Sequence, residues 1–477
     1  MLTECSFGLK NCPKELRFAR KPRYNGRNAP RRRNTMHIVN TKYGPVSGIR
    51  RNGCEQYLGI PYARPPVGEG MFRHPEEPEP WTEVRMADRG SANPVQAEAG
   101  FKVWNNSLDC LYLNIFVPEE KKETPRPVMV WLYGGNYAQG GVGAVRPGSE
   151  SLVYDLARFA AETDTVVVAL NYRLNLYGFL NLHFLDPSFD SNNGLYDQIR
   201  ALEFVRDNIA AFGGDPRNVT LFGQSAGGAC TLALMTMPEA KGLFQKTIVQ
   251  SACVEHFFTE KESRRYTRRY LRFAGVKEPE ELKNLSMQRV ERANKLFSNQ
   301  MRAMGEIRCA FSPVIDGRTL RREPKQAVRE CDLPMLIGNT SQEANLFLGS
   351  TPAAVLPFVE RAIHVRAVPG RGNYRQRVCD GLTDHIYIRP QLEILRGYRG
   401  PAWRYEYHYV LPHSSLGCFH ASEVAVLFCM NGMFGPVDDP ETQRVGAAMR
   451  KIWRDFAWNG DPGWEPFPEN EMCQRIP

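Results

Sequence analysis

Residues 223–227, in the order Gly-Gln-Ser-Ala-Gly, have the types and the spacing of a nucleophilic serine site. They follow the apolar run 219–222 and precede small residues that open a helical pattern, which is the strand–turn–helix setting of a nucleophile elbow. Glycine at positions 223 and 227 removes Cβ atoms where such a turn is tightest, so the serine is free to take a strained conformation with its Oγ exposed. The pattern predicts Ser225 as a nucleophile.

A serine nucleophile needs a base and an acid that orients the base, and in this type of site the chain order is serine, acid, histidine. Two histidines, His413 and His420, lie beyond the strand expected at 403–410. His413 reads as a turn residue, whereas His420 sits in a loop that leads into an apolar segment and is the candidate base. Glu343 lies just past the strand expected at 334–338 and is the candidate acid, although an ordinary carboxylate at a helix N-terminus would also explain it.

The third part of such a site is a pair of backbone N–H groups that bind the oxyanion. Gly134, Gly135 and Asn136 directly follow the apolar run 128–132, which matches the glycine-rich loop that supplies one donor. Gly135 or Asn136, together with Ala226, would then donate to the oxyanion. An ordinary turn is the alternative explanation for the two glycines, and their place directly after a buried strand argues against it.

The surrounding pattern alternates between strands and helices and shows no internal repeat. Short, continuously apolar runs are typical of strands buried on both faces of a parallel sheet. A helix is expected from apolar residues at steps of three or four over 195–209, with Gly213 as its stop. The runs expected as strands are 128–132, 165–170, 219–222, 246–250, 334–338 and 403–410. The fold class is therefore α/β: one domain over residues 37–477, with helical excursions at about 260–330 and 345–400.

Charge divides the chain into two unequal parts. The net charge is +9, and residues 1–36 carry ten basic residues against two acidic ones, which leaves +1 for the rest. The basic extension 1–36 lacks any period of 2 or 3.6 and is expected to be disordered. The preferred explanation is a solvated extension, or a misassigned start with Met36 as the true one. A transit peptide is the less favoured alternative, because it would be rich in serine and amphipathic, and Ser6 is the only serine here.

Composition excludes several classes of protein. With 42% apolar and 24% charged residues the chain is globular, and no apolar run is long enough for a membrane span. Twelve cysteines without a C-x-x-C pair favour reduced, buried thiols over a disulfide scaffold or a zinc site. Together with the lack of an apolar leader, this predicts a cytoplasmic protein.

An arginine cluster lies in the first helical excursion. Five arginines within residues 264–272 accompany Tyr266, Tyr270 and Phe273 at helical spacing. A basic amphipathic helix of this kind can bind a membrane surface or nucleic acid, but the solvated face of a surface helix is the commoner explanation. The latter is preferred, so neither nucleic acid nor membrane is expected as a partner.

At the serine elbow and in the loops that carry Gly134, Glu343 and His420, the sequence resembles the type-B carboxylesterase/lipase family, which includes the cholinesterases. The resemblance covers roughly residues 38–468. Besides the elbow and the loops of Glu343 and His420, it rests on the stretches 57–68 (YLGIPYARPPVG), 109–114 (DCLYLN), 171–173 (NYR), 212–216 (FGGDP) and 460–462 (GDP). It implies an α/β-hydrolase fold, with a large, mostly parallel sheet flanked by helices.

The resemblance also implies a function. Ser225, His420 and Glu343 would form the triad, and Gly135, Asn136 and Ala226 the oxyanion hole. The chain would cleave small-molecule carboxylic esters through an acyl-enzyme, without a metal or an organic cofactor. A lipase or an amidase on the same triad, and a non-catalytic cholinesterase-like binding module, are the alternatives.

Three departures from the family pattern are visible. Gln224 stands where the family usually has Glu, which removes a negative charge beside the serine and is expected to weaken attraction for cationic substrates. Asn136 replaces a Gly or Ala, and it tolerates a positive φ better than most residues do. Cys110 is present, but its usual disulfide partner appears as Pro94, so no bridge is expected. Gln224 and Gly134 are predicted to line the substrate-binding site.

Overall fold

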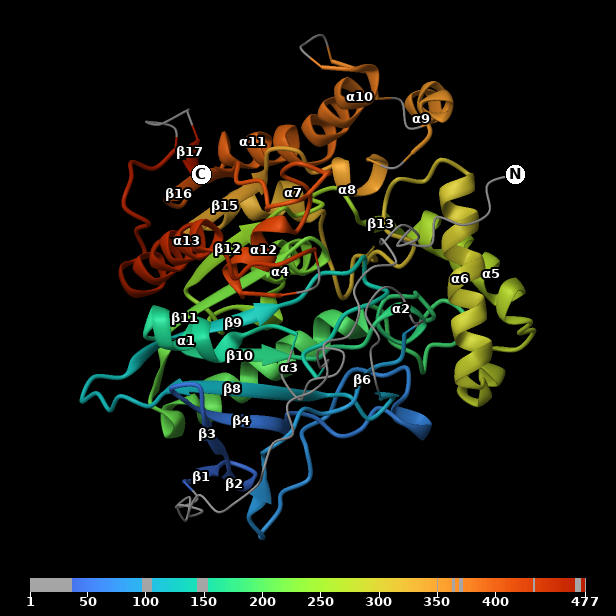
Figure 1. Cartoon of the computed structure of the whole chain (residues 1–477). Coiled ribbons are helices and arrows are strands. Elements are labelled where there is room, and N and C mark those ends of the chain that lie inside the picture. The colour runs from blue at the N-terminus through green and yellow to red at the C-terminus, as the bar shows by residue number, and fades with distance from the viewer. Residues whose placement is uncertain are drawn as a thin grey trace, which may run out of the picture.

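A ten-stranded sheet runs through the molecule (Figure 1). The computed structural model describes residues 37–96, 105–143, 153–349, 351–362, 365–368, 372–431, 434–467 and 473–476, so the predicted basic extension lies outside it. The strand order is β17-β16-β15-β12-β11-β9-β10-β8-β4-β3. Their bounds are β3 Ile49–Arg51, β4 Cys54–Pro61, β8 Tyr112–Pro118, β9 Arg126–Leu132, β10 Val166–Leu170, β11 Gly214–Gln224, β12 Lys246–Gln250, β15 Met335–Thr340, β16 Ala402–Tyr407 and β17 Gln474–Ile476.

The middle and one edge of the sheet are parallel, and the other edge is antiparallel. Strands β10, β9, β11, β12, β15, β16 and β17 pair in parallel, whereas β8 pairs antiparallel with β10 and β4, and β4 pairs antiparallel with β3. Every residue of β9, β10 and β12 is buried, which fits a sheet covered on both faces. The six strands expected from apolar runs are all present. Strand β16 ends earlier than expected, at Tyr407, because the chain turns outward and leaves Val410 47% exposed.

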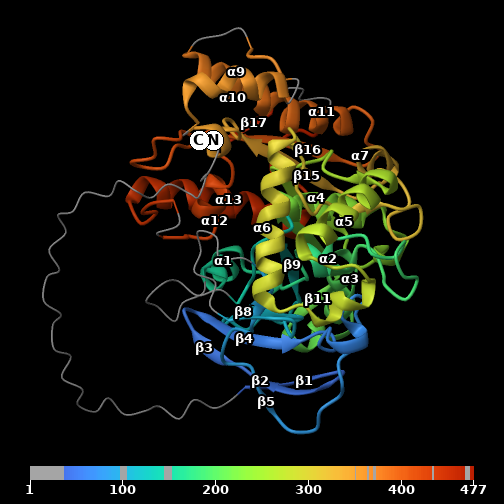
Figure 2. The same ribbon diagram turned by 90° about the vertical axis from the view of Figure 1, so that its right-hand side faces the viewer.

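Helices cover both faces of the sheet (Figure 2). Helices α1 (Leu156–Thr163), α12 (Ser422–Leu427) and α13 (Pro440–Asn459) lie on one side, and α3 (Asn193–Asn208) and α4 (Ala226–Thr236) on the other. The predicted helix at 195–209 is α3. A 3₁₀ turn, η2 (Ile209–Phe212), continues it to Gly213, where a φ of 79° ends the helical path as expected.

The two excursions are largely helical, as predicted. The first contains α5 (Glu260–Ala274), η4 (Pro279–Asn284), α6 (Met287–Ala303), α7 (Pro324–Ala327) and η5 (Val328–Glu330). The second contains α8 (Asn345–Leu348), η6 (Ala353–Val355), α9 (Leu356–Ala362), α10 (Tyr374–Thr383), the π-helix η7 (Asp384–Ile388) and α11 (Arg389–Leu395). The sequence patterns did not predict a short parallel pair, β13 (Phe258–Thr259) with β14 (Val314–Ile315). This pair joins the residues just before α5 to residues that follow α6.

Smaller elements complete the described chain. They are a three-stranded sheet of β1 (Ile38–Thr41), β2 (Gly44–Ser47) and β5 (Arg85–Met86), the pair β6 (Asn93–Pro94) and β7 (Asn106–Ser107), and η1 (Gly68–Gly70), α2 (Asn175–Gly178) and η3 (Pro238–Ala240). Within the described residues, no helix is both long and apolar enough to cross a membrane.

The arginine-rich segment forms α5, which packs against α6 at one edge of the molecule (Figure 1). Thr259 and Glu262 form a capping box at its start. Tyr266 and Tyr270 are buried, while Arg264 and Arg268 are exposed and lie over the ring of Phe184. The cluster is thus on the outer face of a surface helix.

Candidate active site

Ser225 lies at the turn between a central strand and a helix. Strand β11 ends at Gln224, α4 begins at Ala226, and Ser225 between them has φ 57° and ψ −122°. A non-glycine residue rarely takes this conformation, so the turn holds strain of the kind found at functional sites. The Ser225 N–H donates to the Gln250 carbonyl at the end of β12 (2.9 Å), which fixes the elbow to the neighbouring strand.

The elbow glycines are needed because backbone segments approach closely. A Cβ on Gly227 would lie 2.1 Å from the Leu132 carbonyl oxygen, and a Cβ on Gly223 would lie 2.5 Å from that of Gly227. A Cβ on Gly134 would lie 3.0 Å from the Cβ of Ser225. The start of α4, the end of β9 and the loop after β9 are therefore packed directly on one another.

His420 and Glu343 form a buried pair. The Nδ1 atom of His420 contacts Glu343 Oε2, and Glu343 Oε1 accepts from the Thr340 N–H at 2.7 Å. The two residues are 4% and 0% exposed. Because a carboxylate only accepts, Nδ1 carries the proton in the neutral imidazole, and Nε2 has the unprotonated lone pair that a general base needs. His413, the other histidine considered, is exposed in a turn with φ 64°.

A second buried carboxyl lies near this pair. Glu423, at the start of α12, is fully buried, and one of its oxygens accepts from the Ser251 hydroxyl at 3.5 Å. Burial and the neighbouring Glu343 raise the pKa of Glu423 well above its usual range. The carboxyl in direct contact with the imidazole is that of Glu343, whereas Glu423 lies behind it against Ser251.

The Oγ atom of Ser225 forms no hydrogen bond with another described residue. The side-chain nitrogen of Gln224 instead lies 3.2 Å from His420 Nε2. The structure thus brings Glu343 and His420 into contact and places Gln224, rather than Ser225 itself, against Nε2 of His420. Gly134, the other predicted substrate-binding residue, packs on the backbone of the elbow.

The loop after β9 presents unpaired backbone donors beside the elbow. Gly135 has φ 121° and Asn136 has φ 56°, in agreement with the tolerance of Asn for a positive φ. Among the described residues, the N–H groups of Gly135, Asn136 and Ala226 have no hydrogen-bond partner. Two hydrogen bonds between Gln96 and the backbone of Gly140 (2.7 and 2.8 Å) hold the far end of the loop.

The excursions supply the walls around His420. The rings of Phe347 and Tyr387 lie with their centroids 5.3 and 5.4 Å from that of His420. On the side of the loop after β9, Cys309 donates to the side-chain oxygen of Asn136 at 3.4 Å, and His256 Nδ1 lies 3.5 Å from the Cys309 sulfur. Here a cavity of about 150 Å³ is lined by Glu255, His256, Ile307, Arg308, His385 and Ile386.

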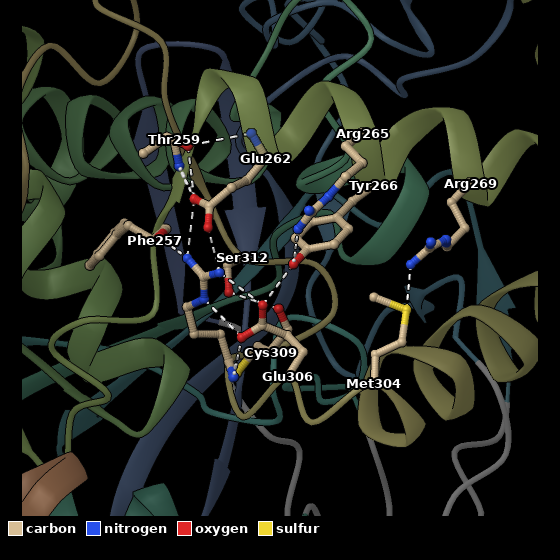
Figure 3. Close-up of polar contacts among 11 residues, drawn as sticks. Phe257, Thr259, Glu262, Arg265, Tyr266, Arg269, Met304, Glu306, Cys309 and Ser312 are labelled. Atoms are coloured by element: carbon tan, nitrogen blue, oxygen red, sulfur yellow. Dashed lines mark hydrogen bonds and ion pairs between the residues drawn. The ribbon is translucent and has the colours of Figure 1, made fainter. Parts of the chain in front are cut away.

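Arg308 forms several hydrogen bonds that hold the segment next to Cys309 in place. Arg308 donates to Glu262 of α5 (2.7 Å), to Glu306 (2.8 Å) and to the carbonyl of Phe257 (3.2 Å). Figure 3 shows Glu262 and Glu306 in this network, with Cys309 close by. Burial acts to raise the pKa of Glu262, but hydrogen bonds from Arg308 and Thr259 lower it to about 2, so the ion pairs persist in acid.

The elbow at the carboxyl end of a central strand, in a mostly parallel sheet flanked by helices, defines an α/β-hydrolase. The model of the carboxylesterase family matches residues 35–368. This chain belongs to the carboxylesterase family and is a carboxylic ester hydrolase, as the resemblance implied.

Known esterases resemble this chain over nearly its full length. The para-nitrobenzyl esterase of Bacillus subtilis (strain 168) is 34% identical and aligns over 90% of this chain and 91% of its own. Carboxylesterase 1F of Mus musculus is 30% identical, over 90% and 87% of the two chains. The crystal structure of a Geobacillus stearothermophilus carboxylesterase at pH 6.2 superposes with a TM-score of 0.81 at 30% identity, over 92% of this chain and 96% of that one.

Sequence reasoning missed the residues of the walls. Phe347, Tyr387, Cys309 and His256 come from the excursions or from the loop that leads into the first one, where no motif marks them. Only the packing of those segments over the sheet brings their side chains to the site. Within the described residues, no group of three or more His, Cys, Asp or Glu side chains is placed to hold a metal ion.

Proposed function

We propose that this esterase works through a Ser225–His420–Glu343 triad, with the N–H groups of Gly135, Asn136 and Ala226 as the oxyanion hole. The observation that carries the proposal is the buried contact between Glu343 and Nδ1 of His420, which leaves Nε2 unprotonated next to the elbow. The strained conformation of Ser225 and the unpaired N–H groups of the loop after β9 support it.

The reaction proceeds in two half-reactions. Ser225 Oγ attacks the ester carbonyl carbon while His420 Nε2 takes the hydroxyl proton, and Glu343 stabilises the imidazolium that forms. The oxyanion accepts hydrogen bonds from the backbone donors. Cleavage of the ester C–O bond releases the alcohol, which receives the proton from His420. Water then attacks the acyl-enzyme by the same route and frees the carboxylic acid and Ser225.

A fluorophosphonate probe tests the assignment directly. The probe should attach covalently to the full-length protein, and peptide mass spectrometry should map it to Ser225. Ser225→Ala and His420→Ala should each reduce kcat by about a millionfold, and the double variant little further, because the triad acts as a unit. His413→Ala, a histidine in an exposed turn, is the matched control and should retain activity.

The same experiment decides between the proposal and its rival. A non-catalytic binding module would not be labelled at Ser225 and would show no ester turnover above that of the His420→Ala variant. Hydrolysis of amides or of long-chain emulsified esters at rates equal to those of simple esters would favour the amidase or lipase alternative, since the triad does not fix the leaving group.

A further inference from the structure

The side chain of Gln224 lies between the proposed base and the loop after β9. Its nitrogen is 3.2 Å from His420 Nε2, and its oxygen would lie 2.9 Å from a Cβ placed on Gly134. The residue is 5% exposed, so water does not compete freely for these atoms. The amide therefore fills the position next to Nε2 in the resting enzyme.

The direction of this hydrogen bond follows from the other side of the imidazole. Glu343 accepts at Nδ1, so the ring proton is there and Nε2 is a pure acceptor. The Gln224 amide must then donate to Nε2, which a glutamate at this position is unable to do while ionised. The lone pair that would take the Ser225 proton is thus already engaged, and Ser225 Oγ has no hydrogen bond to a described residue.

We propose that Gln224 is a positioning residue that caps the general base in its neutral form and must release Nε2 when the Ser225 proton is transferred. The inference rests on the proposed triad. A donor that is bonded to the neutral imidazole opposes the imidazolium, because a protonated Nε2 would face the N–H groups of the amide. The hydrogen bond from Gln224 must therefore break each time Nε2 takes the proton, and its removal should move the acid limb of the activity.

The other groups around the imidazole define the electrostatic setting. Glu343 is the acidic group in contact with Nδ1. Burial and the neighbouring Glu343 raise the pKa of Glu423 well above its usual range. Burial together with the neighbouring Arg308 lowers the pKa of His256 to about 4, so His256 is neutral at pH 7. Tyr387 contributes a ring, and burial raises the pKa of its hydroxyl, which is therefore not charged. Gln224 is the uncharged group in direct contact with Nε2.

The test compares the pH dependence of kcat/KM for 4-nitrophenyl acetate in three proteins. Gln224→Met removes the donor, and the midpoint of the acid limb should rise by about half to one pH unit, the equivalent of one neutral hydrogen bond. Gln224→Glu also adds an anion that stabilises the imidazolium, so the midpoint should rise further. Gln56→Met, at a buried glutamine of β4, is the matched control and should leave the midpoint unchanged.

The pH dependence of fluorophosphonate labelling gives a second readout that does not require turnover of an ester. Its acid midpoint should shift in the same order, and a variant too slow for steady-state assays is measured this way. Variants that lose rate uniformly without a shift of the midpoint would overturn the capping role, because Gln224 would then be only structural. Failure of the wild type to label at Ser225 would instead refute the proposed triad.

Discussion

Around Ser225, the polar side chains of Glu343 and His420 are fully hydrogen-bonded, whereas two backbone N–H groups have no partner among the described residues. Glu343 is satisfied on both oxygens, and His420 is fixed at both ring nitrogens. The N–H groups of Gly135 and Asn136 have no partner among the described residues, which leaves them available to a developing negative charge. In the proposed mechanism, these fixed groups hold Ser225 and His420 in place for the transfer of one proton between them.

His256 should make folding sensitive to acid. Burial and the neighbouring Arg308 lower its pKa to about 4, from an unfolded value of about 6.5. At pH values between these two pKa values only the unfolded chain binds the proton. The free energy of unfolding should therefore fall by about 3 kcal/mol as the pH falls from 6.5 to 4. Urea unfolding of the wild type and of His256→Gln at pH 7 and pH 4 measures this loss. The other titrating groups affect both proteins alike, so the wild type should lose more free energy of unfolding than the variant. Equal losses in both proteins would contradict the assignment.

Between elements, a fully buried ion pair connects the sheet to α3. Arg173, in the loop after β10, donates to Asp197 of α3 at 2.8 and 2.6 Å, and also to the carbonyls of Met71 and Arg73. The two side chains are 2% and 0% exposed. The Arg173 guanidinium and its counter-charge thus hold together three segments that are distant in sequence: the loop after β10, α3 and residues 71–73.

Removal of one partner of this pair should be costly. Asp197→Ala leaves Arg173 buried without a counter-charge, and we expect a loss of about 3–5 kcal/mol in the free energy of unfolding. Glu441→Ala, which breaks the exposed pair with Arg444 on α13, is the matched control and should leave the free energy of unfolding nearly unchanged. Chemical denaturation measures both, and similar losses for the two variants would show that burial is not the cause.

At the scale of the whole molecule, the extension 1–36 differs from the rest of the chain in its net charge. The extension 1–36 accounts for nearly all of the net charge of +9, and the family match begins at residue 35. The description of 1–36 as disordered, and of 37–477 as one domain, stays a prediction.

A chain that begins at Met36 should therefore keep the activity of the full protein. We expect kcat/KM for 4-nitrophenyl acetate to agree within about twofold, since no residue of the proposed site lies in the removed part. The shortened chain should be nearly neutral and should bind a cation exchanger more weakly. A loss of activity of tenfold or more in the shortened chain would show that the extension contributes to the site.

The cysteines should not respond to reductant. Cys110, for which no bridge is expected, is a buried free thiol, as are Cys54, Cys230 and Cys253 among the described residues. A disulfide typically contributes 2–4 kcal/mol, so the thermal midpoint with and without dithiothreitol should agree to within about 1 °C. A clear drop with reductant would reveal a bridge that involves Cys5 or Cys12.

The local sequence was sufficient to predict where the candidate site lies. The pattern at 223–227, after an apolar run, placed Ser225 in the elbow, and strand-end loops nominated Glu343, His420 and Asn136. The contact between Glu343 and His420 could be anticipated because a parallel sheet brings the carboxyl ends of its strands to one edge, so that short-range patterns place distant residues together. The catalytic roles of these residues stay a prediction.

Only the tertiary structure decided what surrounds that chemistry. Tyr387, Cys309 and His256 reach the site through excursions whose sequences carry no motif, and the contact between Gln224 and Nε2 of His420 depends on side-chain packing. Amphipathic periodicity determines which face of a helix is buried, but not against which part of the sheet it lies. The walls around His420 therefore depend on packing between segments far apart in the chain.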